Sequence, residues 1–251
     1  MTTDNPIRLH WLDPRNPRQA FPPPGSAMRD PNGLLAIGGD LSVTRMIRAY
    51  SQGIFPWYNP DEPILWWCPD PRAVLEPSAF RISRSFAKTL RRGDFAVTLN
   101  HCPAQVLDAC AGPRRGSRGT WLGPDMRSAY LELHETGFCQ SIEVWRHGRL
   151  IGGLYGVSVG RAFFGESMFS REPDASKIAL AFLCRQLQDW RYELIDCQIS
   201  SQHLQSLGAV DISRERFLAM LRQAVGVPGR TGKWRFEIPV PASREHRPEG
   251  P

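Results

Sequence analysis

The chain has 251 residues, of which 41% are hydrophobic and 22% are charged, values typical of a soluble globular protein rather than a disordered or membrane-embedded one. No apolar run approaches the roughly 18 residues of a spanning helix, and the polar, proline-rich start does not resemble a signal peptide, so we expect a cytoplasmic protein. The formal net charge of +6 favours a polyanionic partner. The six cysteines contain no CxxC pair, and we expect them to be reduced thiols in the core.

The first part of the chain, residues 1–72, is predicted to form a small α+β domain. Its first 30 residues are rich in proline and are expected to form an extended arm. A Gly-Gly-Asp turn then leads into a short helix, for which Asp40 or Ser42 is the expected N-cap. An aromatic, turn-rich segment follows, and a strand is expected over residues 64–67.

The second part, residues 73–251, is predicted to form a larger domain that ends in an irregular tail. Spacing of apolar residues predicts four helices, over residues 83–92, 104–111, 126–137 and 175–190, the last with Asp174 as a possible cap. Strands are expected over residues 140–146, 149–159, 161–169 and 192–199, with a helical turn over 202–207. Three strands in a meander, then a helix and another strand, favour an α+β fold with a mixed sheet.

Two apolar, strand-like segments each carry an acidic residue, which suggests a buried polar site. In a regular strand Asp196 and Gln198 share one face, and Cys197 points to the other face, where we expect it to be a core residue. Glu166 and Met168 likewise share a face, although the preceding glycine could allow a bulge. Two carboxylates suit a substrate with cationic groups, but Asp196 could instead be satisfied by a backbone or an arginine partner.

Basic residues recur in two clusters that are close together in the sequence. The first cluster has three- and four-residue spacing, which would line one side of a helix, and comprises Arg81, Arg84, Lys88, Arg91 and Arg92. The second cluster, Arg114, Arg115 and Arg118, falls in a glycine-rich segment. Each cluster alone could be a solvated face, whereas the two together favour a nucleic-acid partner.

The chain resembles a known family, the bacterial leucyl/phenylalanyl-tRNA–protein transferases. The resemblance runs from about Phe21 to Phe217 and rests on motifs in the family's order: DPNGLLAIGGD (30–40), GIFPWY (53–58), ILWWCPDPR (64–72), GTW (119–121), GGLYG (152–156), GESMFS (165–170), ASK (175–177) and IDCQ (195–198). It implies a GNAT-like acyltransferase domain, which a small N-terminal domain completes. It also implies transfer of Leu, Phe or sometimes Met from aminoacyl-tRNA to acceptor proteins with N-terminal Arg or Lys, which marks them for N-end rule degradation. A monomer without cofactor or membrane partner is expected.

The resemblance also assigns roles to residues. Catalysis is expected from Asp196, Gln198 and Glu166, with Asp196 holding the acceptor α-amino group, Gln198 orienting it, and Glu166 binding a charged or hydroxyl group of one substrate. Asp196 as a base is a hypothesis, because a carboxyl pKa near 3.9 is too low unless desolvation raises it. The donor pocket is expected on Leu154, Phe163, Met168, Leu180, Leu183 and Ile195, although core packing explains each of these equally well. Trp57 and Trp121, with Tyr50 and Tyr130 nearby, are candidates for stacking on the terminal adenosine.

Two other functions compete with this interpretation. An acetyl-CoA-dependent N-acetyltransferase would need a glycine-containing pyrophosphate turn, and residues 170–177 contain no glycine. A non-catalytic RNA-binding module would leave Glu166 and Asp196 unexplained, because buried carboxylates oppose a phosphate ligand. No metal site is expected, since the His and Cys residues lack ligand spacing, and His203, which could flank the site, is expected to be structural.

Overall fold

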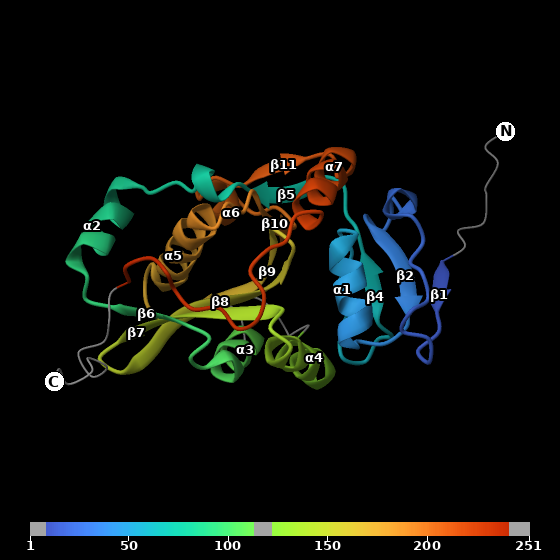
Figure 1. Ribbon diagram of the computed structural model, residues 1–251, viewed down its shortest axis with the longest axis horizontal. Helices are drawn as coiled ribbons and strands as arrows, with labels where there is room; N and C mark the ends of the chain where they lie inside the picture. The colour runs from blue at the N-terminus through green and yellow to red at the C-terminus, as the bar shows by residue number, and fades with distance from the viewer. Residues whose placement is uncertain (1–8, 113–121, 241–251) are drawn as a thin grey trace.

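The computed structural model describes residues 9–112 and 122–240, arranged around a small sheet and a large sheet (Figure 1). The small sheet, on the right of Figure 1, is built from the first 67 residues, and the large sheet begins at Arg72. Across both described ranges, no helix is long and apolar enough to cross a membrane.

The small sheet has the order β1-β2-β4-β3, formed by His10–Leu12, Leu34–Gly38, Leu65–Trp67 and Phe55–Pro56. The expected arm is irregular except where its residues pair in parallel with β2 as strand β1, and where a 3-10 turn forms at Pro24–Ser26. Helix α1 (Val43–Ser51) follows, and Ser42 is its cap, because its hydroxyl accepts a bond from the Arg45 amide. Asp40 instead bonds the Arg45 side chain.

The large sheet has the order β11-β5-β10-β9-β8-β7-β6. Its strands are β5 (Arg72–Leu75), β6 (Ala96–Leu99), β7 (Cys139–Arg146), β8 (Arg149–Val159), β9 (Ala162–Ser170), β10 (Leu194–Gln198) and β11 (Val210–Ile212). All neighbours are antiparallel except β9 and β10, which helix α5 (Ala175–Asp189) connects. The mixed sheet and the α+β class predicted from the sequence are confirmed.

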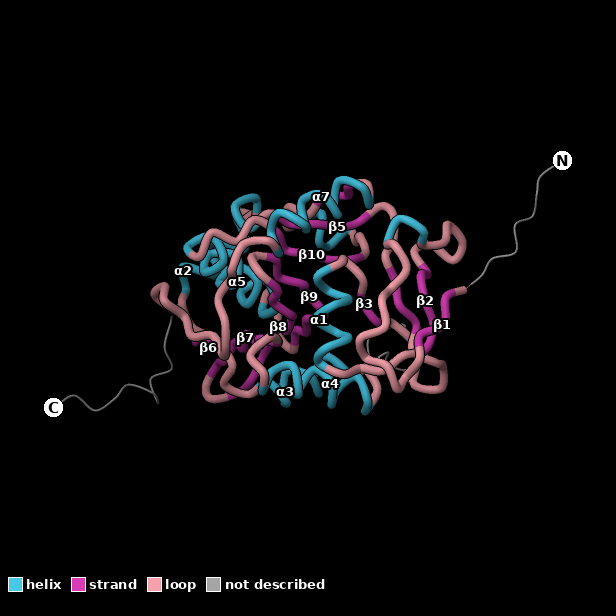
Figure 2. Tube along the Cα trace, turned by 45° about the vertical axis from the view of Figure 1, so that its right-hand side comes forward, coloured by secondary structure: helices cyan, strands magenta, loops and turns pink. Residues whose placement is uncertain are grey.

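Helices cover both faces of the large sheet. Adjacent residues in the central strands alternate between two apolar clusters: Phe163 packs with α5, whereas Phe164 packs with α3 (Pro103–Ala111) and α4 (Pro124–Glu135). The cluster on the side of α3 and α4 continues into the small sheet and α1, so the two sheets share one core. Figure 2 shows α1 between the small sheet and the strands of the large one.

The predicted helices are confirmed with small shifts of their ends, and α5 has Asp174 at its N-cap position, as expected. The Asp174 side chain accepts bonds from Lys177 and from Thr89 of α2 (Arg84–Arg92), and makes no capping bond. The predicted helical turn near residue 202 is α6 (Gln202–Ser206). The sequence did not predict the 3-10 turn Pro77–Ala79, the strands β2, β3, β5, β6 and β11, or the helix α7 (Arg214–Val225).

Candidate active site

Two β-bulges lie next to each other in β9 and β10. In β9 the register shifts so that Glu166 is an extra residue between the partners of Tyr155 and Gly156, which confirms the bulge anticipated from Gly165. In β10 the register shifts between Asp196 and Gln198, which makes Cys197 the extra residue. The parallel pairing of the two strands ends at Asp196 and Phe164, beside both bulges, and the opening that follows is the mouth of a cavity.

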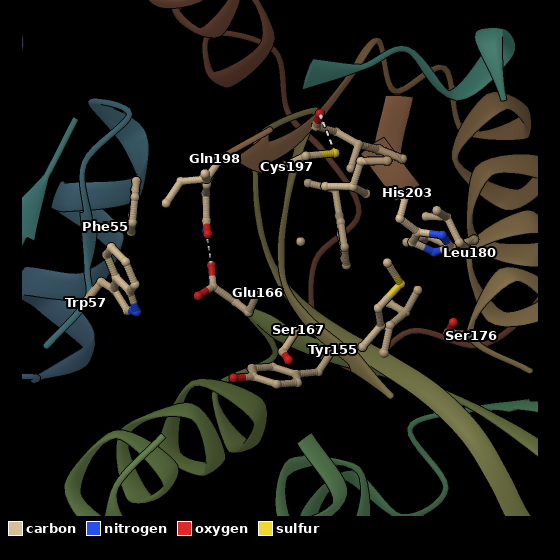
Figure 3. A pocket seen from close by; sticks show the side chains of 18 of the residues that line it. Phe55, Trp57, Tyr155, Glu166, Ser167, Ser176, Leu180, Cys197, Gln198 and His203 are labelled. Atoms are coloured by element: carbon tan, nitrogen blue, oxygen red, sulfur yellow. Dashed lines mark hydrogen bonds between the residues drawn. The ribbon is translucent and has the colours of Figure 1, made fainter. Parts of the chain in front are cut away.

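The cavity has a volume of about 510 Å³ and lies between β8, β9, β10, α5 and the start of α6. In Figure 3, Glu166 and Gln198 lie on the side that faces Phe55 and Trp57 of the small domain, and Leu180 and His203 lie on the opposite side. The end with Glu166 and Gln198 therefore carries a carboxylate and a carboxamide and is called the polar end. The end with Leu180 is lined mainly by aliphatic side chains and is called the apolar end. The lining comprises Phe55, Pro56, Trp57, Leu154, Tyr155, Phe163, Gly165, Glu166, Ser167, Met168, Ser176, Leu180, Leu183, Ile195, Cys197, Gln198, Ile199, His203 and Leu204.

Glu166 is held in place by side chains from three other elements. The Tyr130 hydroxyl donates to its Oε2 at 2.5 Å, and Gln198 Nε2 donates to its Oε1 at 2.9 Å. Tyr50 of α1 lies 3.0 Å from the Tyr130 hydroxyl, so the hydrogen-bonded chain reaches the small domain. Burial raises the pKa of Glu166 to about 7, although the bonds from Tyr130, Tyr50 and Gln198 oppose that shift. The group therefore titrates near neutral pH.

Asp196 lies behind the cavity wall and is fully buried in a bidentate ion pair. Arg72 donates to its two oxygens at 2.8 and 2.6 Å. The guanidinium lies between the rings of Phe55 and Phe217, with its Cζ 4.8 and 4.4 Å from their centroids. Asp196 is absent from the cavity lining, so this geometry does not bring it into direct contact with a bound amine.

Gln198 departs from the regular alternation expected for this strand. It has φ of 64°, a left-handed conformation, and its backbone N–H donates to Asp196 Oδ1 at 2.9 Å. The expectation that Asp196 and Gln198 share one face is wrong, because Gln198 lines the cavity and Asp196 does not. Cys197 lies on the face opposite Asp196 and packs against the apolar cluster of α5, as expected, and it lines the cavity because the cavity is on that face, with Ile195. Burial first, and then the charge of Asp196, raise the pKa of the Cys197 thiol to about 12, so the thiol is protonated at neutral pH.

The structure gathers most of the other candidate residues around this cavity. All six residues expected at the donor pocket line it, as does Trp57, whose side chain is 42% exposed. Tyr50 and Tyr130 are fully buried and present no face to a base, so the expectation of stacking is wrong for these two. Trp121 and the basic residues Arg114, Arg115 and Arg118 lie outside the described residues.

Some residues of the site were missed by the sequence analysis. Arg72 is one, although a lone arginine at the start of the apolar segment Arg72–Leu75 signals a buried charge that needs a partner. Phe55, Ser176 and Ile199 are others: the first two lie in the family motifs GIFPWY and ASK, which assigned them no role, and nothing in the local sequence distinguishes Ile199 from a loop residue. His203, which was expected to be structural although close enough to flank the site, lines the cavity; burial and then the charge of Lys177 lower its pKa.

Comparisons with known proteins identify the group to which the chain is related. Residues 74–222 match the family described as leucyl/phenylalanyl-tRNA protein transferase, and residues 39–70 match the N-terminal domain of the same family. A leucyl/phenylalanyl-tRNA–protein transferase from Alkalilimnicola ehrlichii is 53% identical over 96% of this chain and 95% of its own. The chain belongs to this family.

Other relatives support the same assignment. The leucyl/phenylalanyl-tRNA–protein transferase of Methylococcus capsulatus is 56% identical over 86% of this chain and 92% of its own. Among solved structures, a GCN5-related N-acetyltransferase from Kribbella flavida is 8% identical, with a TM-score of 0.37 over 64% of this chain and 57% of that one. That likeness is too remote to support a conclusion.

Membership of an aminoacyltransferase family gives the two ends of the cavity a chemical meaning. A group transfer between two substrates needs a place where both reacting atoms meet. Here the apolar end adjoins a carboxylate and a carboxamide within one cavity. In the described ranges, no three His, Cys, Asp or Glu side chains are grouped closely enough to hold a metal ion.

Proposed function

We propose that the protein transfers Leu or Phe, and also Met, from aminoacyl-tRNA to the α-amino group of proteins that begin with Arg or Lys, which marks them for N-end rule degradation. The observation that carries this proposal is the cavity of about 510 Å³, apolar at one end and polar at the other, in a member of this family. The proposal includes a monomeric enzyme that works in the cytoplasm, where aminoacyl-tRNA is available.

The apolar end is the proposed binding site for the donor side chain. Leu154, Met168 and Leu183 come from two strands and a helix and offer no charge, so a charged donor side chain would lose its hydration without a partner. The flexible thioether of Met168 can adapt to unbranched and aromatic shapes. This lining supports a donor preference for Leu, Phe and Met.

The tRNA would then lie outside the cavity mouth. Trp57 is the described aromatic residue that offers an exposed face there, and stacking of one base contributes about 1 to 3 kcal/mol. The phosphates of the acceptor stem are proposed to contact the basic side chains of α2 and of the segment just before it, all of which are exposed.

The polar end is the proposed binding site for the acceptor amine. The amine nitrogen attacks the ester carbonyl of the donor, the ester bond breaks, and the terminal ribose oxygen of the tRNA leaves as a hydroxyl, taking up the proton that the amine gives to the base. Gln198 orients the amine but cannot serve as a base, because a neutral amide does not accept a proton. Glu166 is at the cavity wall with a pKa of about 7, suited to take the proton that the amine loses.

Asp196 acts indirectly in this proposal. Its Oδ1 accepts a hydrogen bond from the backbone N–H of Gln198, which fixes the left-handed turn there. The ion pair with Arg72 holds Asp196 in place. Positioning of this kind can supply much of the rate acceleration, since the ester donor is already activated and an α-amino group with a pKa of about 7.7 to 8.0 is partly neutral at pH 7. Asp196 is thus a positioning residue.

The test uses labelled Leu-tRNA and three peptides that differ only in their first residue, Arg, Lys or Ala, with labelled acetyl-CoA as a parallel donor. The proposal expects Leu transfer to the Arg and Lys peptides, little transfer to the Ala peptide, and none from acetyl-CoA. Acetyl transfer, or equal use of the three peptides, would contradict the proposal.

A further inference from the structure

The C-terminal segment formed by residues 226–240 packs against the catalytic domain, beyond residue 222 where the family match ends. We call it the C-terminal strap. Figure 1 shows it in red, following α7 and running past the central strands. Its residue Trp234 is only 3% exposed and belongs to the apolar cluster of α5.

Buried side chains of the catalytic domain hold the strap in place. Gln140 Oε1 accepts a bond from the Trp234 amide at 3.0 Å, and Asn100 Nδ2 donates to the Trp234 carbonyl at 3.1 Å. Gln186 Oε1 accepts from the Glu237 amide at 2.7 Å. Gln186 is fully buried, and its Oε1 accepts only from the strap amides of Glu237 and Ile238 among the described residues, so without the strap this oxygen would lack a partner. The strap is therefore tied to β7 and α5 on both sides of Trp234.

The indole of Trp234 is in contact with a ring that lines the donor cavity. Its centroid lies 5.9 Å from that of Phe163, and the rings of Trp190 and Tyr192 enclose it at 5.0 and 5.7 Å. On another side of Phe163 is Gly156, where an added Cβ would lie 2.5 Å from the Phe163 ring. Trp234 and Gly156 are thus two of the neighbours that confine the Phe163 ring, and a smaller side chain at Trp234 would relax one of these contacts.

We propose that Trp234 is a specificity-determining positioning residue, which sets the depth of the apolar end of the cavity by fixing the ring of Phe163. This rests on the proposed function, because it assumes that the donor side chain enters that end. Trp234 itself does not line the cavity. A smaller side chain at position 234 leaves room behind Phe163, its ring retreats, and the deeper pocket favours Phe over Leu as the donor side chain.

The test compares two graded variants, Trp234→Phe and Trp234→Leu, in transfer to an Arg-initiated peptide from Phe-tRNA and from Leu-tRNA. The ratio of the two kcat/KM values is the readout, because a smaller amount of folded enzyme lowers both rates equally and leaves the ratio unchanged. We expect the ratio of Phe to Leu to rise about threefold in Trp234→Phe and about tenfold in Trp234→Leu. If Trp234→Leu does not fold, the ratio measured for Trp234→Phe alone tests the inference.

Two further variants serve as controls. Phe86→Leu removes a buried ring from the same apolar cluster, and Phe86 does not line the cavity, so the ratio should stay at the wild-type value. In a Phe163→Leu background, adding Trp234→Phe should not change the ratio further, because Trp234 acts through the ring that is now missing. An unchanged ratio in both Trp234 variants would overturn the inference, whereas a wild-type enzyme that transfers neither amino acid would instead refute the proposed function.

Discussion

Glu166 and Asp196 have similar side chains in one site but different environments. Glu166 lies at the cavity wall and accepts hydrogen bonds from a hydroxyl and a side-chain amide, whereas Asp196 is buried in an ion pair with Arg72. The first carboxylate is able to exchange a proton with a substrate near neutral pH, and the second is locked in an ion pair. Proton exchange and positioning are thus assigned to different carboxylates.

The raised pKa of Glu166 predicts a pH-dependent stability. Between its ordinary pKa of 4.5 and about 7, the folded state holds the Glu166 proton more strongly than the unfolded state does. Ionisation of Glu166 therefore lowers stability as pH rises through this window, and Glu166→Gln removes that effect. The unfolding free energy of the variant, relative to wild type, should rise by about 2 kcal/mol between pH 4.5 and 8 in urea titrations. A fully buried group would contribute about 1.36 kcal/mol for each unit by which its pKa is raised, and the expected total is smaller because Glu166 is part-exposed. A difference that does not vary with pH would contradict the assignment.

The ion pair of Asp196 predicts a separation between stability and activity. Asp196→Asn leaves the Arg72 charge buried without its partner, and should lower the unfolding free energy by about 3 to 5 kcal/mol. The double variant Arg72→Met with Asp196→Leu should regain most of that stability in urea denaturation. Its single-turnover transfer rate should stay low, because the bond that fixes the Gln198 amide is still missing. Full recovery of transfer in the double variant would exclude the positioning role.

At the scale of elements, the two bulges account for the difference between the predicted and the observed site. The apolar pattern predicted the strands, and Gly165 signalled the first bulge. Nothing in the sequence Ile195-Asp196-Cys197-Gln198 signals the second, because glutamine has no preference for a left-handed conformation. Strict alternation therefore placed Gln198 on the face of Asp196, whereas Gln198 lines the cavity and Asp196 does not.

The left-handed conformation of Gln198 predicts an unusual order of stability among its variants. Gln198→Ala and Gln198→Gly both remove the bond to Glu166, so they differ chiefly in backbone preference. Glycine adopts this conformation without strain, and Gln198→Gly should be more stable than Gln198→Ala by about 1 kcal/mol in thermal or urea unfolding. Transfer should be reduced in both variants. If alanine proved the more stable, the conformation described for this turn would be incorrect.

At the scale of the whole molecule, the site depends on contacts between segments far apart in the chain. Arg72 meets Asp196 across 124 residues, and Tyr50 meets Tyr130 across 80. Local spacing and propensity carry no information about such pairs, which is why the sequence predicted stacking for Tyr50 and Tyr130 instead of support for Glu166. The six residues expected at the donor pocket were anticipated at the cavity because the resemblance to the family, rather than the periodicity, indicated their positions.

The basic surface on and just before α2 predicts salt-dependent tRNA binding. Arg84, Lys88 and Arg91 are exposed, and among the described residues none of them forms an ion pair. Replacing these three residues by Gln should weaken binding and reduce the slope of log affinity against log salt by about 0.7 to 0.9 for each phosphate that the variant no longer neutralises. Arg15→Gln, a change at a highly exposed residue of the N-terminal arm, is the control. An unchanged slope in the triple variant would show that the phosphates bind elsewhere.

The most direct test of the account is whether the apolar end of the cavity receives the donor side chain. Leu180 lines that end and is 6% exposed, so Leu180→Trp should fill it, whereas Val210→Trp adds the same indole at a position of β11 that is 51% exposed and away from the cavity. The measurement is the single-turnover rate of Leu transfer from Leu-tRNA to an Arg-initiated peptide by folded enzyme. We predict a fall of about 100-fold or more for Leu180→Trp and no change for Val210→Trp. Equal and undiminished rates in the two variants would contradict the assignment of this cavity as the transfer site.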